Sequence, residues 1–561
     1  MAIDVSANIT GVTLTQLVLE TDPDAPPANG ITTPIITGSI LFGSGADTMD
    51  IRDGLVYGDI DFGGGADTLL ISGDAEVRGA LSSADGLLSI DVSGGLLDAH
   101  QESRLDIASL SVGADGDLII TIDPASGTGG GFNVSGTASF ADGAGLGVRF
   151  TSLVDDPTRY TIVEASDLDF GAIDQSSLEE NSPYLFVVEA GGDEAAGQVF
   201  VDVRRRTADE IGMITSEASA YDAVYEALNA DDELRAAFLA QNNRDDLLDI
   251  YEQMLPDHSG GALISLASGV DAVTRALSGR NNSAARGETS AWLQEINFYA
   301  DKETNEAYGF KSEGFGFAGG VERGTAFGAI GVSTAFTSSD LEDPSAAAEE
   351  RLSANLLELG LYWRAQRGSW TTWARGAGGY ASFESVRQFV GEGILRRADA
   401  DWNGYTVTAA AGASYERSYG RYSLRPEVVV EYFGLNEDGF QETGGGEGFD
   451  LAIEDREGHI FSSTAALNFG MGFGENQWLR PEIRVGWRQI ISHDGGVTTA
   501  RFLSGGPAFD LAADSLEGGG PIVGLRLNVG NELGMLAIEA DAELLDDYVR
   551  YALLLRASFR F

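Results

Sequence analysis

The sequence contains no cysteine, only two lysines, and 13 prolines among 561 residues. Without cysteine the chain has no disulfide framework, no thiolate metal ligand and no cysteine nucleophile. Acidic residues outnumber lysine and arginine by 87 to 35, and the formal net charge of −52 excludes nucleic acid as a plausible partner. No apolar run reaches the roughly 18–20 residues of a membrane-spanning helix. The N-terminus lacks the basic start and apolar core of a secretion signal, so we expect that an exported precursor has lost its signal.

Glycine, by contrast, is abundant at 74 residues, and it marks a repeat in the first third of the chain. Residues 42–49 (FGSGADTM) recur at 62–69 (FGGGADTL), a period of 20 residues, with weaker echoes at 84–91 and 114–120. Short apolar strands separated by Gly and Asp corners at this period predict a parallel β-solenoid. We expect a right-handed solenoid over residues 36–206, preceded by a poorly ordered segment at 1–35.

The period then becomes helical. Thr207 and Glu210 form the pattern of a capping box, and apolar residues follow at spacings of three and four. Residues 207–280 are therefore predicted to be a helical linker, whose last helix covers 262–277. That helix is rich in small and polar residues, which suits a polar pore better than lipid. The pore-facing candidates on it are Ser265, Ser268, Asp271 and Arg275.

From residue 281 to Phe561 the sequence alternates with period two. In the last strand, apolar residues from Val549 to Phe561 alternate mostly with charged or small residues such as Arg550 and Arg556. A strand between lipid and a wet lumen requires this pattern, and only a closed barrel lets strands cross a bilayer. We count about twelve antiparallel strands, and all seven tryptophans of the chain lie among them, as expected for aromatic girdles. The predicted lumen-facing residues are Arg425, Glu427, Arg480, Glu482, Arg484, Arg488, Glu539, Asp541, Arg550 and Arg556.

Three stretches of this mainly β chain resemble the C-terminal part of monomeric autotransporters, the type V secretion family. They are residues 199–212, residues 255–262, and the last strand from Tyr551 to Phe561. The resemblance implies a solenoid passenger whose final stabilising coils lie near 159–203, a helix in the pore, and a 12-stranded transmembrane β-barrel at 281–561. It also implies that the outer-membrane assembly machinery reads an aromatic C-terminal signal. The residues of that signal would be Tyr551, Leu553, Leu555, Phe559 and Phe561.

Two narrower site hypotheses are disfavoured. Asp47 and Asp67 lie in Gly-rich contexts similar to calcium-binding repeats, but they are 20 residues apart, whereas such repeats recur every nine residues. Some autotransporters cleave themselves between two asparagines, and Asn281 and Asn282 follow the predicted pore helix. Their surroundings do not match the self-cleaving subgroup. A turn before the first barrel strand is the simpler interpretation.

The sequence thus predicts an outer-membrane anchor and translocator of a Gram-negative bacterium, with lipid and the assembly machinery as partners and the passenger at the cell surface. The rival interpretation is a surface adhesin or self-associating protein whose acidic solenoid is the binding part. A soluble carbohydrate-active solenoid enzyme leaves the amphipathic C-terminal half unexplained. With four histidines and no nucleophile elbow, we predict no enzyme and no cofactor.

Overall fold

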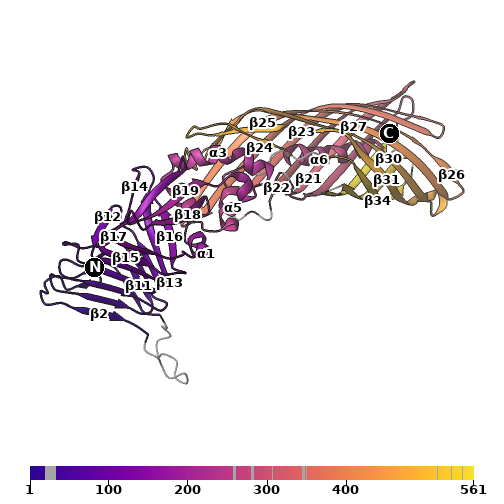
Figure 1. The fold of residues 1–561 in the computed structure, drawn as a ribbon. Coiled ribbons are helices and arrows are strands. Elements are labelled where there is room, and N and C mark those ends of the chain that lie inside the picture. Colours follow the sequence, from indigo (N-terminus) through magenta and orange to yellow (C-terminus); the bar gives the residue numbers. More distant parts are fainter. Residues whose placement is uncertain are drawn as a thin grey trace, which may run out of the picture. The chain divides into compact units, whose positions relative to one another are not determined.

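The computed structural model describes residues 1–18, 33–256, 261–278, 284–305, 307–343, 346, 348, 350–513, 516–531, 533–545 and 547–561 (Figure 1). The chain forms two units. One comprises residues 1–211 and 232–248, and the other comprises residues 212–231 and 249–561. Among the described residues, no helix combines the length and the apolar character needed to cross a membrane.

The first unit is built from short strands that stack in parallel from one coil to the next. Thr48 pairs with Thr68 in register, which reproduces the period of 20 seen in the sequence. The longest stack contains β2 (Thr13–Gln16), β5 (Thr48–Ile51), β8 (Thr68–Ile71), β11 (Ser89–Ala99), β13 (Ser109–Asp123), β15 (Gly131–Phe140) and β17 (Thr158–Phe170). Beside it lie β3 (Ile35–Thr37), β6 (Leu55–Tyr57) and β9 (Glu76–Gly79), and a separate sheet contains β1 (Ile3–Asp4), β4 (Ile40–Leu41), β7 (Ile60–Asp61) and β10 (Leu81–Ser82). The prediction of a solenoid of parallel strands is confirmed.

The solenoid begins earlier than the sequence suggests. β1 and β2 lie within residues 1–35, where we expected poor order, yet each pairs in register with the following coil. The backbone N–H of Val12 also donates to the Asp47 carboxylate at 2.6 Å. These strands are only two and four residues long, so their order comes from the neighbouring coil rather than from their own sequence. Residues 19–32 lie outside the described part of the chain.

The C-terminal end of the stack changes to antiparallel pairing. β19 (Gln198–Arg205) runs antiparallel to both β17 and β18 (Phe186–Asp193). α1 (Gln175–Glu180) packs on this part of the unit, with β12 (Arg104–Ile107), β14 (Thr128–Gly129) and β16 (Gly145–Phe150) completing the sheet. Inside, aliphatic and aromatic side chains stack from coil to coil, as in the Phe42–Phe62 ring pair, whose centroids are 5.4 Å apart. Every coil buries its apolar face against the next, so the last coil needs a different cover. An antiparallel hairpin supplies it and closes the stack.

Four helices follow the solenoid in the sequence: α2 (Ala208–Ile211), α3 (Thr215–Ala230), α4 (Asp232–Leu239) and α5 (Arg244–Glu252). The capping box predicted at Thr207 is confirmed. The Thr207 N–H donates to the Glu210 carboxylate at 2.9 Å, and the Glu210 N–H donates to the Thr207 hydroxyl at 3.3 Å. Arg204 donates two further hydrogen bonds to Glu210, at 2.7 and 2.8 Å. One carboxylate thus ties the last solenoid strand to the start of the helical segment.

This cap will depend on pH. The hydrogen bonds from Arg204, with that from the Thr207 N–H, lower the pKa of Glu210 from 4.5 to about 2. Because the pKa is lowered on folding, the stabilisation is complete above pH 4.5 and disappears as the pH falls through about 2. We expect Glu210→Gln to speed amide hydrogen exchange at residues 208–211 at pH 6, and the difference from the parent chain to shrink toward pH 2. Asp209→Asn, next to it but outside the box, is the control. Equal exchange in Glu210→Gln and the parent chain at pH 6 would contradict the role assigned to this carboxylate.

The second unit contains a closed antiparallel barrel of twelve strands, which confirms the predicted count. In chain order they are β20 (Thr289–Lys302), β21 (Phe310–Thr325), β22 (Gly328–Glu342), β23 (Glu350–Arg367), β24 (Trp370–Gly391), β25 (Ile394–Tyr415), β27 (Tyr422–Glu437), β30 (Arg456–Met471), β31 (Leu479–Asp494), β34 (Gly519–Gly530), β35 (Gly534–Leu545) and β36 (Tyr548–Arg560). β36 closes the barrel by pairing with β20 along its whole length. A short strand, β26 (Arg417–Tyr419), extends one hairpin. A separate small sheet contains β28 (Phe440–Gln441), β29 (Leu451–Ile453), β32 (Val497–Phe502) and β33 (Phe509–Ala512).

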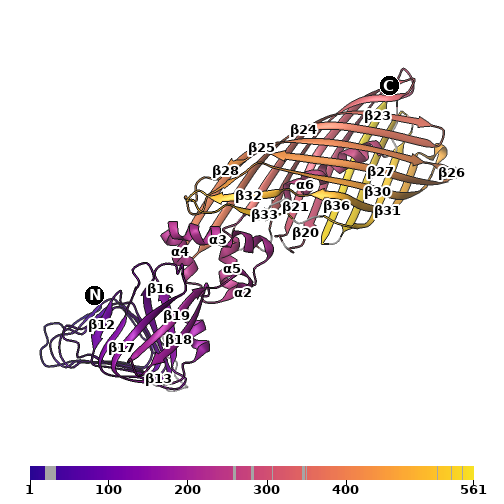
Figure 2. The ribbon, with the colours of Figure 1, turned by 45° about the horizontal axis from the view of Figure 1, so that its top comes forward.

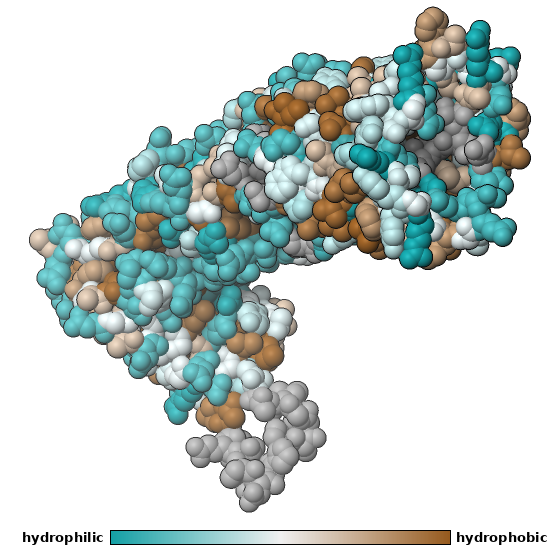
Figure 3. Space-filling view, turned by 90° about the vertical axis from the view of Figure 1, so that its right-hand side faces the viewer, coloured by the Kyte–Doolittle hydropathy of each residue, from teal (hydrophilic) through white to brown (hydrophobic). Residues whose placement is uncertain are grey.

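The two faces of the barrel wall have opposite character. On β36, Tyr551, Leu553 and Leu555 are exposed on the outside, whereas Arg550 and Arg556 are buried on the inside. The same alternation runs around the barrel, and hydrophobic patches are visible on its outer wall (Figure 3). Large exposed aliphatic and aromatic side chains in such number are stable against lipid rather than water.

The tryptophans do not all belong to this outer surface. Trp370, Trp478 and Trp487 are exposed, but Trp292, Trp373 and Trp402 are buried. The expectation that all seven form girdles is therefore wrong for three of them. Two of the three find a polar partner inside: the indole N–H of Trp292 donates to the Tyr362 hydroxyl at 3.0 Å, and that of Trp402 donates to Glu437 at 3.1 Å. Composition places tryptophan in the barrel but cannot tell its inner face from its outer face.

Candidate functional site: the barrel lumen and its helix

A helix occupies the lumen of the barrel. α6 (Gly261–Ser278) lies among the strands (Figure 2), and almost all of its residues are buried. The barrel wall contacts it on several sides, including β20 to β25, β27, β30 and β36. The lumen of the described structure is thus filled by the chain's own polypeptide.

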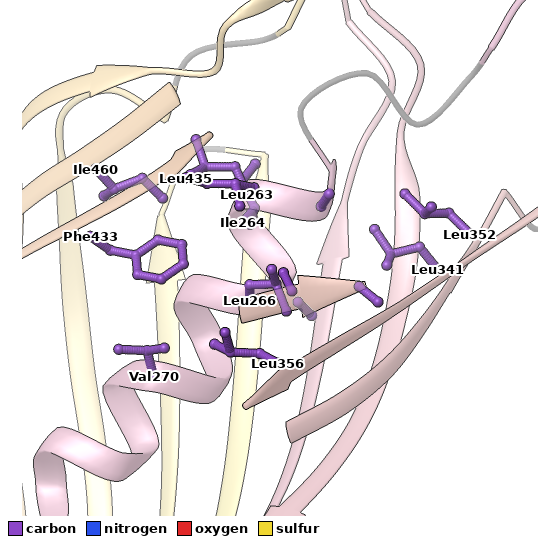
Figure 4. Close-up of a cluster of buried hydrophobic side chains, with 14 of the residues drawn as sticks. Leu263, Ile264, Leu266, Val270, Leu341, Leu352, Leu356, Phe433, Leu435 and Ile460 are labelled. Carbon is purple, nitrogen blue, oxygen red and sulfur yellow. The ribbon is translucent and has the colours of Figure 1, made fainter. Parts of the chain in front are cut away.

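The first half of α6 is held by apolar packing. Leu263, Ile264, Leu266 and Val270 project from the helix into a cluster with side chains of the surrounding strands (Figure 4). The strand residues of this cluster include Leu341, Leu352, Leu356, Phe433, Leu435 and Ile460. This apolar seal excludes water from one part of the pore and stabilises the helix through buried area.

Small side chains bring the same half of the helix close to the wall. The Ser265 hydroxyl lies 2.8 Å from the hydroxyls of both Ser312 on β21 and Ser339 on β22. One turn later, a Cβ atom on Gly269 would lie 3.0 Å from the Thr337 side chain, tighter than ordinary van der Waals contact. A larger residue at either position would push the helix off the wall.

The second half of α6 is held by charge. Arg275 forms an ion pair with Asp271 one turn earlier on the helix at 2.8 Å, and a second with Asp541 on β35. Asp271 in turn contacts Arg550 on β36 at 3.0 Å, and Arg550 pairs with Glu543. All these groups are largely buried, so their attraction is weakly screened and each charge depends on its partner.

This network continues into the wall. Arg484 pairs with Glu427 at 2.9 Å and approaches Asp541 at 3.4 Å. Arg488 lies 3.2 Å from Glu543 and 3.9 Å from Asp271. The lumen therefore has interleaved charges of both signs, and the helix contributes one of each to the network.

Two wall arginines cap the C-terminal end of the helix. Arg556 donates to the main-chain oxygen of Arg275 at 3.2 Å, and Arg425 donates to that of Ser278 at 3.0 Å. The last-turn carbonyls of a helix have no partner within the helix and carry partial negative charge, so cationic donors stabilise them. Gln294 on β20 also donates to the main-chain oxygen of Ala272 at 2.6 Å. These contacts fix how far the helix extends through the pore.

The autotransporter β-domain family model matches residues 291–542 of this chain. The barrel is an autotransporter β-domain. The match ends within β35 and does not include β36, the strand that closes the barrel in the structure. No curated protein matches the chain.

Solved structures with a similar fold include three autotransporter domains. The translocator domain of autotransporter NalP from Neisseria meningitidis is 13% identical, with 55% of this chain and 99% of that chain covered and a TM-score of 0.42. The transport unit of autotransporter AIDA-I from Escherichia coli is 12% identical, with 55% and 99% covered and a TM-score of 0.40. The beta domain of the Bordetella autotransporter BrkA is 12% identical, with 48% and 98% covered and a TM-score of 0.35.

The barrel therefore lies in the outer membrane of a Gram-negative bacterium, where autotransporter β-domains reside. The barrel has an outer-membrane transport role. The exposed aliphatic and aromatic wall described above is the surface that such a location requires.

The structure places the pore-helix candidates of the autotransporter in contact with the wall. Ser265 and Arg275 make the contacts described above, Ser268 lies 3.1 Å from the Tyr548 hydroxyl, and Asp271 bonds to Arg550. Of the ten lumen candidates, eight are buried in the wall, and Arg488 is nearly buried, with 11% of its side chain exposed. Arg480 is the exception: it is partly exposed near a turn and donates to Gln477 at 3.0 Å. It therefore lies away from the helix.

Other lumen residues were missed in the sequence. Thr274 donates to Glu431 at 3.1 Å and accepts from Arg375 at 2.9 Å, and Tyr548 reaches Ser268. The group also includes inward polar residues on β20 to β23: Gln294, Ser312, Glu322, Thr337, Ser339, Glu358 and Arg364. The period-two pattern on those strands was the available signal. The hydroxyl and amide residues stand out little in it, and the charged ones, Glu322, Glu358 and Arg364, are widely separated among small and apolar residues.

The asparagine cleavage pair and the calcium site, both disfavoured above, differ in what the structure says of them. Asn281 and Asn282 lie outside the described residues. Asp47 and Asp67 are buried at the solenoid corners, where the Asp47 carboxylate accepts from Val12 and the Asp67 carboxylate accepts from the Asp47 N–H at 2.8 Å. Burial raises the pKa of Asp67. Both carboxylates therefore join successive coils, and among the described residues no group of three histidine or acidic side chains has the geometry of a metal site.

Proposed function

We propose that this autotransporter anchors in the outer membrane and supports the export of its own β-solenoid to the cell surface. The single observation that carries the proposal is α6, a stretch of the same chain that fills the lumen and is hydrogen-bonded to the wall at both ends. A lumen lined by charges of both signs and by hydroxyls can solvate a passing polypeptide without binding it strongly. After export, α6 remains as the seal.

The solenoid suits this route. Each coil pairs mainly with the next one, 20 to 30 residues along the chain, so it can fold coil by coil after it leaves the pore. The antiparallel unit of β17, β18 and β19 lies nearest to the barrel in the sequence and would fold first at the surface. This order gives the segment near 159–203 its proposed role as the stabilising template for the rest of the passenger.

The assembly machinery of the outer membrane is the proposed partner during insertion, and β36 is the proposed signal. Its outward residues Tyr551, Leu553, Leu555 and Phe559 and the terminal Phe561 are all exposed on the barrel surface. A partner can therefore reach them from the lipid side before the barrel closes.

Locking the last coils before export tests the transport proposal. Arg159 and Asp202 are register partners on β17 and β19, both exposed, and 43 residues apart. Because the chain contains no cysteine, an Arg159→Cys/Asp202→Cys pair forms one defined disulfide in the periplasm. We expect this closed loop to stall the passenger, so that external protease no longer cleaves it on intact cells unless reductant is present during growth. Each single-cysteine variant is the matched control, and equal surface display of the double variant without reductant would contradict passage through the lumen.

A further inference from the structure

The two ends of the barrel differ in the length of their connections. At one end, the long connections 438–455 and 495–518 contain the small sheet of β28, β29, β32 and β33. At the other end, short turns join β21 to β22, β23 to β24, and β25 to β27, and β26 lies there (Figure 2). Outer-membrane barrels have short turns on the periplasmic side and longer loops outside. The short-turn end of this barrel therefore faces the periplasm.

Arginine gathers at this periplasmic end. The segment before β20 and the three short turns with their flanking residues contain five arginines and two carboxylates. These segments are residues 284–289, 323–328, 366–371 and 415–422. We call their arginines the basic rim: Arg286, Arg323, Arg367, Arg417 and Arg421. At the opposite end, residues 437–457 alone contain eight carboxylates and one arginine. In a chain with a net charge of −52, the basic rim is a local reversal of sign.

The basic rim is exposed and has no acidic partner within the described part of the chain. Most other arginines of the barrel pair with a carboxylate, but none of these five does. Two of them contact rings instead: the guanidinium carbons of Arg417 and Arg421 each lie 5.2 Å from a ring centroid, that of Tyr419 and that of Tyr422. A guanidinium has five N–H donors, so most of the donors of the rim remain available to an external anion.

The basic rim lies where the lipid-facing wall ends. On β21, Arg323 follows Val321 on the same exposed face. Arg367 on β23 is the register partner of the exposed Trp370 on β24, whose ring packs on Tyr415 with the centroids 5.1 Å apart. Aromatic rings at the edge of an apolar wall are typical of the membrane–water interface. An arginine beside them can rest its stem on apolar surface while its head reaches the phosphates.

We propose that the basic rim binds anionic phospholipids in the periplasmic leaflet of the outer membrane. The guanidinium groups donate to the phosphate oxygens, for which their forked geometry is suited. The neighbouring rings pack on the apolar part of the same lipids. The excess of positive charge selects a headgroup with net negative charge over a zwitterionic one, whose amine it repels.

The placement of the arginines favours a lipid layer over a soluble anion. A site for one free phosphate brings its donors together at one point. Here the arginines of successive turns are two strands apart, about 10 Å at the usual spacing of strands, so they cannot share one phosphate. They follow the edge of the wall from β20 to β27 instead. Separate cationic contacts along such an edge match a layer of headgroups.

Lipid competition on the full chain tests the basic rim. The chain in detergent micelles is mixed with equal amounts of phosphatidylglycerol and phosphatidylcholine that have the same acyl chains, and the retained lipids are counted by native mass spectrometry. We expect the parent chain to retain phosphatidylglycerol over phosphatidylcholine by at least about fivefold, the ratio that one basic residue near an anionic surface produces. Replacing all five rim arginines by glutamine should abolish this preference.

Two double variants make the comparison specific to position. Arg417→Gln/Arg421→Gln removes two rim arginines and should clearly reduce the preference. Arg351→Gln/Arg501→Gln is the matched control, because both arginines are exposed at the long-loop end and, among the described residues, neither pairs with a carboxylate. It should behave as the parent chain does, and heat-modifiable migration verifies that each variant folds.

Four results would overturn the proposal. They are equal retention of the two lipids by the parent chain, an unchanged preference after the five replacements, an equal loss in the two double variants, and displacement of the lipid by inorganic phosphate beyond that caused by chloride at the same ionic strength. The last result would identify a site for a soluble anion.

Discussion

A chain that ends after Leu545 will not accumulate as a closed barrel in the outer membrane. The missing strand, β36, pairs with β20 on one side and β35 on the other along its whole length. Without it, both neighbours would expose rows of backbone N–H and C=O groups to hydrocarbon, where each unsatisfied group costs several kcal/mol. We expect loss of the heat-modifiable band and of the protein in outer-membrane fractions, a complete effect rather than a graded one.

A single substitution separates the structural role of β36 from its proposed role as a signal. The Phe561 ring is highly exposed, while the backbone of this residue bonds to Thr289 at 2.9 and 3.2 Å. Phe561→Ala therefore keeps these backbone bonds and removes only the ring. If the assembly machinery reads the ring, this variant should insert poorly in cells yet refold in detergent with parent stability. Normal insertion in cells would refute the signal and leave the argument about barrel closure intact.

Arg275→Met should destabilise the seated helix by about 3–5 kcal/mol, the usual cost of removing one partner from a buried ion pair. Arg275 is the one cation of α6, and it neutralises Asp271 and Asp541, which would otherwise remain buried with an excess of negative charge. Methionine nearly matches the arginine in length but leaves both carboxylates short of a partner. We expect a lower unfolding midpoint in urea and, in planar bilayers, more frequent openings as the helix leaves the wall.

Two further variants test whether the loss of stability comes from the buried ion pairs. Arg275→Met combined with Asp541→Asn removes one carboxylate as well, so much of the loss should be recovered, and the difference gives the coupling energy of the pair. Arg560 on β36 pairs with Glu288 at 3.3 Å in a more exposed place, and Arg560→Met should cost at most about 1 kcal/mol. If Arg275→Met matched Arg560→Met in both stability and conductance, the charge network would not hold the helix.

The barrel could be predicted from the sequence because lipid and lumen impose opposite demands on alternate residues. In β36, the apolar residues Tyr551, Leu553 and Leu555 alternate with residues that include Arg550 and Arg556. This pattern is visible in the sequence without any knowledge of the neighbouring strands. The capping box at Thr207 and the coil period of 20 are local signals of the same kind.

Contacts between distant parts of the chain could not be predicted from the sequence. The inward turn of Trp292 depends on Tyr362, 70 residues away, and the fit of Gly269 depends on Thr337. The short strands β1 and β2 depend on the coil that follows them. In each case the residue type permits two environments, and only the partner decides between them.

The charge balance of α6 has a consequence for its movement. Between residues 261 and 278 the helix contains one carboxylate, Asp271, and one guanidinium, Arg275, paired with each other one turn apart. Its side chains therefore enter and leave the pore as an electrically neutral body. A voltage across the membrane does no net work on them, and the wall keeps the same net charge whether the helix is present or not.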